Sequence, residues 1–185
     1  MKRLIILLLL ITSILNGYCQ DTTAVVTLNG NLTSDQLFKK AKEWYALTFK
    51  SANDVIQLSD LDTKKIIAKG EVEFSYRVNS FHFPYIYAFT LSVQFKDGRY
   101  KYDLTNTRAF AKEKGGVETS MEDFKKMQTP EGYRELLKGV KFGGMVNVEK
   151  ASKQANENYS NMRSIQYNLI KSLTDYLNMD KNNNW

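Results

Sequence analysis

Residues 85–110, "YIYAFTLSVQFKDGRYKYDLTNTRAF", decide the fold. Hydrophobic and polar side chains alternate on both sides of Asp97-Gly98. The pair Asp-Gly is typical of a two-residue type I′ turn, because both positions of that turn need positive φ. The pattern predicts a β-hairpin with one apolar face and one polar face. The residues predicted to face inward are Tyr85, Tyr87, Phe89, Leu91, Val93, Phe95, Tyr100, Tyr102 and Leu104.

The chain before the hairpin predicts further antiparallel strands. Residues 65–78, "KIIAKGEVEFSYRV", alternate in the same way, with Ile66, Ala68, Gly70, Val72, Phe74, Tyr76 and Val78 on one face and Lys65, Ile67, Lys69, Glu71, Glu73, Ser75 and Arg77 on the other. Residues 24–29 and 54–60 predict two shorter strands, and 79–84, "NSFHFP", predict a connection. A meander of this kind has one dry face, which helices cover, and one polar face.

A helix is predicted between the first two strands. Thr33 is a good N-cap with Gln36 as its capping-box partner, and Leu32 can pack on Leu37 across the cap. The apolar stripe of this helix consists of Leu37, Ala41, Trp44, Tyr45 and Thr48 or Phe49. We expect Lys39, Lys40, Lys42 and Glu43 to fall mainly on its solvent side.

The second half of the chain predicts one long helix. Residues 111–150 read as an irregular connection containing a short helix, with Thr129 as N-cap, Pro130 as first residue and Gly139 as its stop. Residues 151–179 predict the long helix, and 180–185 a polar tail. The apolar stripe of the long helix consists of Tyr159, Met162, Ile165, Leu169, Leu173 and Tyr176 or Leu177. The expected fold class is α+β, with a β-α-β-β-β-β-α order and both helices on one face of the sheet.

The first residues have the pattern of a signal peptide. Lys2 and Arg3 precede the apolar stretch 4–15, which is shorter than the ~18 to 20 residues of a spanning helix. Gly17 and Cys19 supply the small side chains that favour cleavage after Cys19, so 1–19 would be removed. Lipidation of Cys19 is the less favoured alternative because Tyr18 is bulky, and an uncleaved anchor is the third.

The mature chain is then expected to be periplasmic or secreted, without cysteine, disulfide or transmembrane span. Its formal charge falls from +6 in the full chain by the loss of Lys2 and Arg3. The remaining positive charge is a mild bias toward anionic partners, and many inert basic proteins share it.

The stretch from residue 24 to about 110 resembles a known family. The similarity lies in "VVTLNG", "FKSANDVIQL", "KIIAKGEVEFSY" and "VQFKDGRYKY". The family comprises exported Bacteroidota domains of unknown function with a TATA-binding-protein-like (TBP-like) fold. The resemblance implies a helix packed on a curved antiparallel sheet over 20–110, and it implies no activity, substrate or site residue.

The aromatic side chains of the hairpin favour burial over ligand binding. Tyr85, Tyr87, Phe89, Phe95, Tyr100 and Tyr102 share one face. At about 25 cal/mol per Å² and about 150 Å² each, burying one ring is worth roughly 4 kcal/mol. We therefore expect these rings in a core, with a bound apolar ligand between sheet and helix as the alternative.

Catalytic constellations are weak in this sequence. His82 is the only histidine and the mature chain would lack cysteine, so neither a metal site nor a cofactor is expected. Glu71 and Glu73 share one face of a strand, and paired carboxylates can hydrolyse glycosides at a suitable separation. A strand produces such pairs often, however, and Lys69 and Arg77 beside them indicate solvated ion pairs.

The leading hypothesis is a non-catalytic binding or structural module of the bacterial envelope. Its partner would be a protein or glycan on the polar sheet face or beside the long helix. The binding candidates on that face are Lys69, Glu71, Glu73, Arg77, Lys101 and Asp103. The mixed charges of this face and the export of the protein both argue against nucleic-acid binding. The name of the fold does not support it either, because a fold name carries no activity. A carboxylate-based hydrolase and a carrier of an apolar ligand are the alternatives, and the oligomeric state is open.

Overall fold

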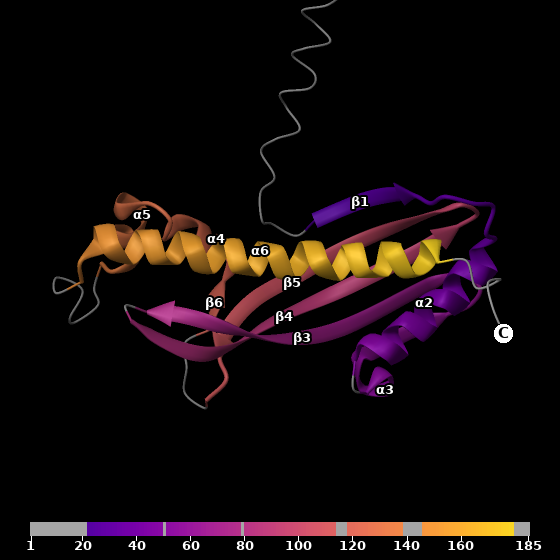
Figure 1. Ribbon diagram of the computed structural model, residues 1–185, viewed down its shortest axis with the longest axis horizontal. Coiled ribbons are helices and arrows are strands. Elements are labelled where there is room, and N and C mark those ends of the chain that lie inside the picture. Colours follow the sequence, from indigo (N-terminus) through magenta and orange to yellow (C-terminus); the bar gives the residue numbers. More distant parts are fainter. Residues whose placement is uncertain (1–21, 50, 79, 114–117, 139–145, 180–185) are drawn as a thin grey trace, which may run out of the picture.

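The structure is a computed structural model that describes residues 22–49, 51–78, 80–113, 118–138 and 146–179. The expected signal peptide and its cleavage site, the stop at Gly139 and the polar tail 180–185 lie outside the described residues. Figure 1 shows an open, curved antiparallel sheet with the longest helix, α6, lying along it and α2 at one end. The α+β class and the curved sheet are confirmed.

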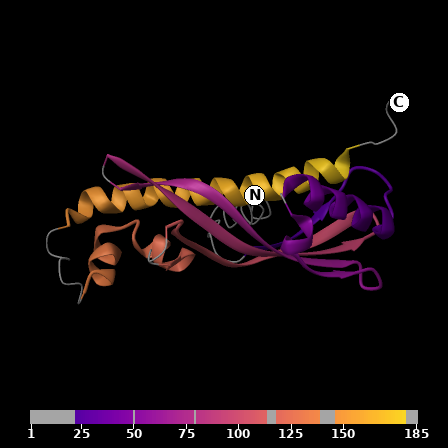
Figure 2. The same cartoon turned by 90° about the horizontal axis from the view of Figure 1, so that it is seen from below.

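The sheet is a meander with one rearrangement at its edge. Its strands are β1 (Thr22–Thr27), β2 (Ile56–Asp60), β3 (Lys65–Val78), β4 (Phe81–Lys96), β5 (Arg99–Ala111) and β6 (Thr119–Ser120). The spatial order is β1-β5-β4-β3-β2, all neighbours being antiparallel, and β6 pairs with β5. Figure 2 shows the tip of the β3–β4 hairpin rising to the level of α6.

The connection predicted for 79–84 is wrong, because β4 already begins at Phe81. Phe81 pairs with Val78, and Pro84 with Ser75. Pro84 has no N–H to donate. In this register, however, the backbone of Pro84 points away from β3 and toward the end of β5. Its carbonyl accepts a hydrogen bond from Lys112 N (3.0 Å). The missing donor therefore costs the sheet no hydrogen bond to β3.

The turn at Asp97-Gly98 joins β4 to β5 as predicted, but it is not type I′. Only Gly98 has positive φ (69°). The carboxylate of Asp97 accepts from the Ser34 backbone N–H (2.7 Å), and Gly98 N donates to Leu32 O (2.9 Å). Contacts with the start of the first helix thus set the conformation of this turn.

Helix α2 (Ser34–Thr48) has the predicted capping box, in which Gln36 N donates to the Thr33 hydroxyl and Thr33 N to the Gln36 side chain. A four-residue helix α3 (Ala52–Val55) then takes the place of the first two residues of the strand predicted at 54–60. Asn53 and Asp54 are poor strand formers, which fits this later start.

The helices after the sheet are partly as expected. Helix α4 (Met121–Lys126), capped by Ser120, was not predicted, whereas α5 (Pro130–Leu136) has the predicted Thr129 cap. Helix α6 (Val148–Asn178) begins before residue 151 because the Asn147 side chain caps Lys150 N (2.9 Å). Both short helices pack near the N-terminal half of α6 (Figure 1).

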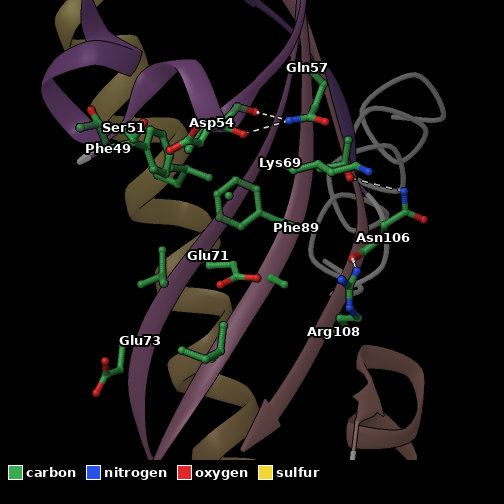
Figure 3. Close-up of a pocket in the computed structure, with 18 residues that line it drawn as sticks. Phe49, Ser51, Asp54, Gln57, Lys69, Glu71, Glu73, Phe89, Asn106 and Arg108 are labelled. Carbon is green, nitrogen blue, oxygen red and sulfur yellow. Dashed lines mark hydrogen bonds between the residues drawn. The ribbon is translucent and has the colours of Figure 1, made fainter. Parts of the chain in front are cut away.

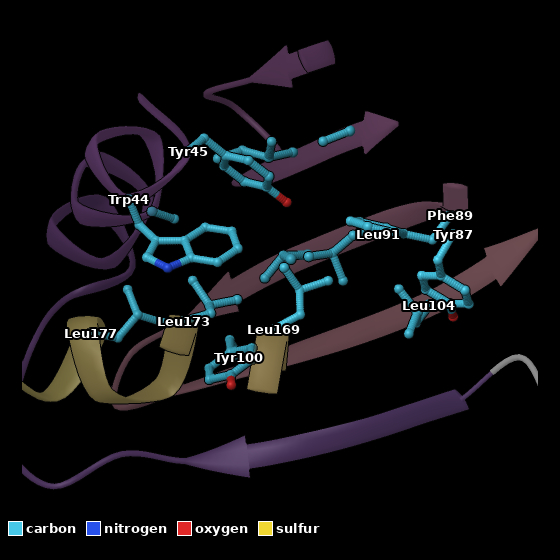
Figure 4. Close-up of a cluster of buried hydrophobic side chains, with 14 of the residues drawn as sticks. Trp44, Tyr45, Tyr87, Phe89, Leu91, Tyr100, Leu104, Leu169, Leu173 and Leu177 are labelled. Atoms are coloured by element: carbon cyan, nitrogen blue, oxygen red, sulfur yellow. The ribbon is translucent and has the colours of Figure 1, made fainter. Parts of the chain in front are cut away.

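The core lies between the apolar sheet face and helices α2, α4 and α6. Figure 4 shows side chains of α2 and α6 meeting those of β4 and β5. The predicted inward rings Tyr87, Phe89, Phe95 and Tyr100 are buried, and Tyr85 and Tyr102 are half-buried. The core interpretation is confirmed, and the space between α2 and the sheet is filled by Trp44, Tyr45 and their neighbours.

Lys40 is an exception to the predicted solvent face of α2. Its side chain is buried, with 9% exposure, and Nζ donates to the Leu177 carbonyl (2.9 Å) and to the Met179 carbonyl. These carbonyls belong to the end of α6, where the helix dipole favours a cation. The expectation was wrong because a tertiary partner supplies acceptors that no local pattern indicates.

Candidate binding groove at the sheet edge

A large hollow among the described residues lies beside β3, beyond Ile56, where β2 begins. We name it the edge groove; it is open and has a volume of about 950 Å³. One wall is the chain segment that runs from the end of α2 into β2, and another is β3. Residues of β4 and β5, most of them on the polar face of the sheet, and Leu169 of α6 complete the lining. Figure 3 shows Lys69, Glu71 and Glu73 in succession along β3, with Asn106 and Arg108 on β5.

Asn106 marks an irregularity that shapes one wall. The β4–β5 register shifts between Ala88 and Thr90, so that two residues of β5 face one of β4. Asn106 has a φ of 52°, a left-handed conformation that asparagine tolerates better than most residues. The bulge places Asn106 and Arg108 in the lining of the edge groove. Neither residue was among the binding candidates, although an asparagine inside a predicted strand is a signal of such a bulge.

Three of the six binding candidates line the edge groove: Lys69, Glu71 and Glu73. All three side chains are exposed. Glu73 forms an ion pair with Lys112 (2.6 Å), and Arg108 pairs with Glu118 (3.2 Å). Within the part of the chain that the structure describes, the side chains of Lys69 and Glu71 have no hydrogen bond or ion pair. These two charges are therefore available to a partner.

The other three candidates lie outside the edge groove. Arg77 is near the tip of the β3–β4 hairpin, where its guanidinium contacts Glu157 (3.4 Å). Lys101 and Asp103 pair with each other (3.2 Å) toward the Asp97-Gly98 turn. The Thr23 hydroxyl, 2.7 Å from Asp103, and Lys101 hold the pKa of the Asp103 carboxyl below its usual value. These charges already satisfy one another.

The described residues offer little for catalysis. No group of three or more His, Asp or Glu side chains among them is placed to hold a metal ion. His82 is exposed, and its Nδ1 lies 2.9 Å from the Ser75 hydroxyl. The Lys112 ion pair occupies one of the two carboxylates that a hydrolase would use.

The structure is that of an α+β protein with an open curved antiparallel sheet, helices on its apolar face, and an open groove at its edge. Residues 23–109 match the model of the family described as "Domain of unknown function (DUF4468) with TBP-like fold". This match confirms the resemblance expected for residues 24–110.

Two solved structures share the fold. A DUF4468 family protein from Bacteroides ovatus is 12% identical, with a TM-score of 0.54 and 88% of each chain covered. A TBP-like protein from Parabacteroides distasonis is 11% identical, with a TM-score of 0.53, and the match covers 82% of this chain and 90% of the other. No curated protein matches the chain. At these identities the likeness establishes the fold alone.

No helix among the described residues combines enough length with enough apolar character to cross a bilayer. The longest, α6, has one buried stripe, and its remaining surface includes charged side chains such as Lys153 and Glu157.

Proposed function

We propose that this protein is an exported, non-catalytic binding module of the bacterial cell envelope that holds a partner protein in the edge groove. The observation that carries the proposal is the pairing of an apolar wall with available charges. Phe49 and Val55 line the groove together with Lys69 and Glu71, whose side chains have no partner among the described residues. Mixed polar and apolar lining is typical of transient protein interfaces.

The two alternative functions have less support. A carrier needs an enclosed apolar space between α2 and the sheet, and Trp44 and Tyr45 occupy that region. A carboxylate-based hydrolase uses a pair of carboxylates, and Glu73 forms an ion pair with Lys112. The binding module is the function that these contacts favour.

Export is tested by the mature N-terminus. The apolar stretch 4–15 and the small residues Gly17 and Cys19 support cleavage after Cys19. Expression in a Bacteroides host, cell fractionation and N-terminal sequencing should give an envelope protein that begins at Gln20. A protein that retains Met1 in the cytoplasm would contradict export, and a lipid on Cys19 would replace cleavage with anchoring.

Site-specific crosslinking tests the groove as the binding site. A photoreactive amino acid placed at Asn106, in the groove, should crosslink a discrete envelope protein in living cells. The same group at Asn161, on the exposed side of α6, is the matched control and should not give that product. Equal crosslinking at both positions, or none at Asn106, would count against the proposed function.

A further inference from the structure

The edge of β3 carries backbone groups that β2 does not reach. The β2–β3 register ends at the pair of Ile56 and Ala68, while β3 continues to Val78. Its pairing with β4 is regular along the whole strand, so the N–H and C=O groups of alternate residues point away from β4. Beyond the end of β2, these residues are Glu71, Glu73, Ser75 and Arg77.

Arg77 shows how such groups are satisfied. Its N–H donates to the Asn158 side-chain oxygen (3.0 Å), and its carbonyl accepts from the Asn158 amide nitrogen (2.9 Å). Asn158 is 1% exposed, so this amide replaces a neighbouring strand at a buried position. The two bonds also establish that the backbone N–H and C=O groups of Arg77 point outward from the edge of the sheet. Because the register is regular, the same holds for Glu71, Glu73 and Ser75.

The edge groove is the space into which Glu71 and Glu73 direct these groups. Helix α3 closes one end, and the Asn158 contact of α6 closes the other. The interval from Gly70 to Ser75 is about 20 Å long at 3.3 Å per residue, the length of a short strand. Phe49 and Leu169 line its inner side, and Glu71 lies on the outer side.

We propose that the edge groove binds an extended peptide of a partner protein as an additional strand on β3, with apolar residues facing α6 and a basic residue facing Glu71. This inference rests on the proposed function and specifies its partner. Strand addition draws affinity from main-chain hydrogen bonds and specificity from alternate side chains. Glu71, which has no partner among the described residues, supplies the charge selection. The charges along β3 that discourage random edge pairing thus favour a complementary strand.

The test uses the mature exported chain and a peptide of roughly six residues in which valine alternates with lysine. Isotope-labelled protein is titrated, and amide hydrogen exchange is followed by NMR. We expect slower exchange at Glu71, Glu73 and Ser75 and unchanged exchange at β1. Methylating the peptide nitrogens that face β3 should weaken binding about tenfold or more, because donors are lost while charge is kept.

A charge exchange provides the matched control. Glu71→Lys, at an exposed position, should lose the lysine peptide and bind a peptide with glutamate in its place; Glu122→Lys on α4 should do neither. Unchanged affinity after methylation, or protection at β1 alone, would overturn strand addition. If, without peptide, the Glu71 amide exchanged more slowly at higher protein concentration, a second copy of the chain would be the occupant. This result would also overturn the proposal. Crosslinking at Asn106 without peptide binding would leave the proposed function standing and reject only this mode.

Discussion

Tyr45 buries a hydroxyl that has no hydrogen-bond partner in the part of the molecule the structure describes. Its side chain is 0% exposed, and burial raises the pKa of the phenol well above its ordinary value. An unsatisfied buried polar group costs about 1–3 kcal/mol. We therefore expect Tyr45→Phe to raise the free energy of unfolding by about 1 kcal/mol in urea denaturation.

Tyr100→Phe is the matched control, because the Tyr100 hydroxyl lies 2.6 Å from the Thr174 hydroxyl. Its removal should lower stability by about 1 kcal/mol. A loss of stability in Tyr45→Phe as large as in Tyr100→Phe would mean that the Tyr45 hydroxyl has a partner.

Gly70 is required by the ring of Phe89, its partner on β4. A Cβ at position 70 would lie 2.4 Å from Phe89 Cζ, and this ring is only 3% exposed, so it has no room to move. We expect Gly70→Ala to destabilise the protein by about 1–3 kcal/mol, measured by thermal and urea unfolding. In the double variant with Phe89→Leu, the added cost of alanine should largely disappear; additive losses would exclude the clash.

At the scale of elements, Lys40 joins α2 to the end of α6. Its ammonium donates to carbonyls at the C-terminus of α6, which lack partners within the helix. Lys40→Met should lower the free energy of unfolding by about 1–3 kcal/mol, since the methylene stem is kept and only the donor is lost. Lys39→Met, at an exposed position, should change it by less than about 0.5 kcal/mol. Equal effects of the two would show that the Lys40 contact is not stabilising.

The elements also show which features the sequence could predict. Alternation over 65–78 and helical spacing in α2 are local patterns, and both gave the right element and the right buried face. The six-residue α4 is too short to show a period. The buried Lys40 and the Arg77–Asn158 contact join segments far apart in the chain. The sequence did not predict the groove because the groove depends on where β2 begins and on the bulge at Asn106.

At the scale of the molecule, α6 is fixed on the sheet by polar contacts embedded in apolar packing. Gln166 donates to the Tyr87 hydroxyl (2.5 Å), and Trp44 Nε1 donates to the Ser172 hydroxyl (3.1 Å). Because both are made by side chains in or beside the core, sliding α6 along the sheet would leave buried donors unsatisfied. The apolar stripe explains why α6 packs on the sheet, and these polar contacts explain its position along the sheet.

Tyr76 and Tyr100 predict the response of the whole fold to alkaline pH. Burial, together with the nearby phenols of Tyr133 and Tyr85, raises the pKa of Tyr76 to about 12, and burial also raises the pKa of Tyr100. A pKa that is higher in the folded state than the unfolded value near 10 contributes stability below pH 10 that is lost as the pH rises toward the folded value. We expect urea midpoints to be constant from about pH 8 to 9.5 and to fall steeply above pH 10, with tyrosinate absorbance and loss of near-UV circular dichroism occurring together. In denaturant the phenols should titrate around pH 10. Complete ionisation of the native protein at that pH, with its circular dichroism intact, would mean that solvent reaches the rings and that α6 does not seal the apolar face of the sheet.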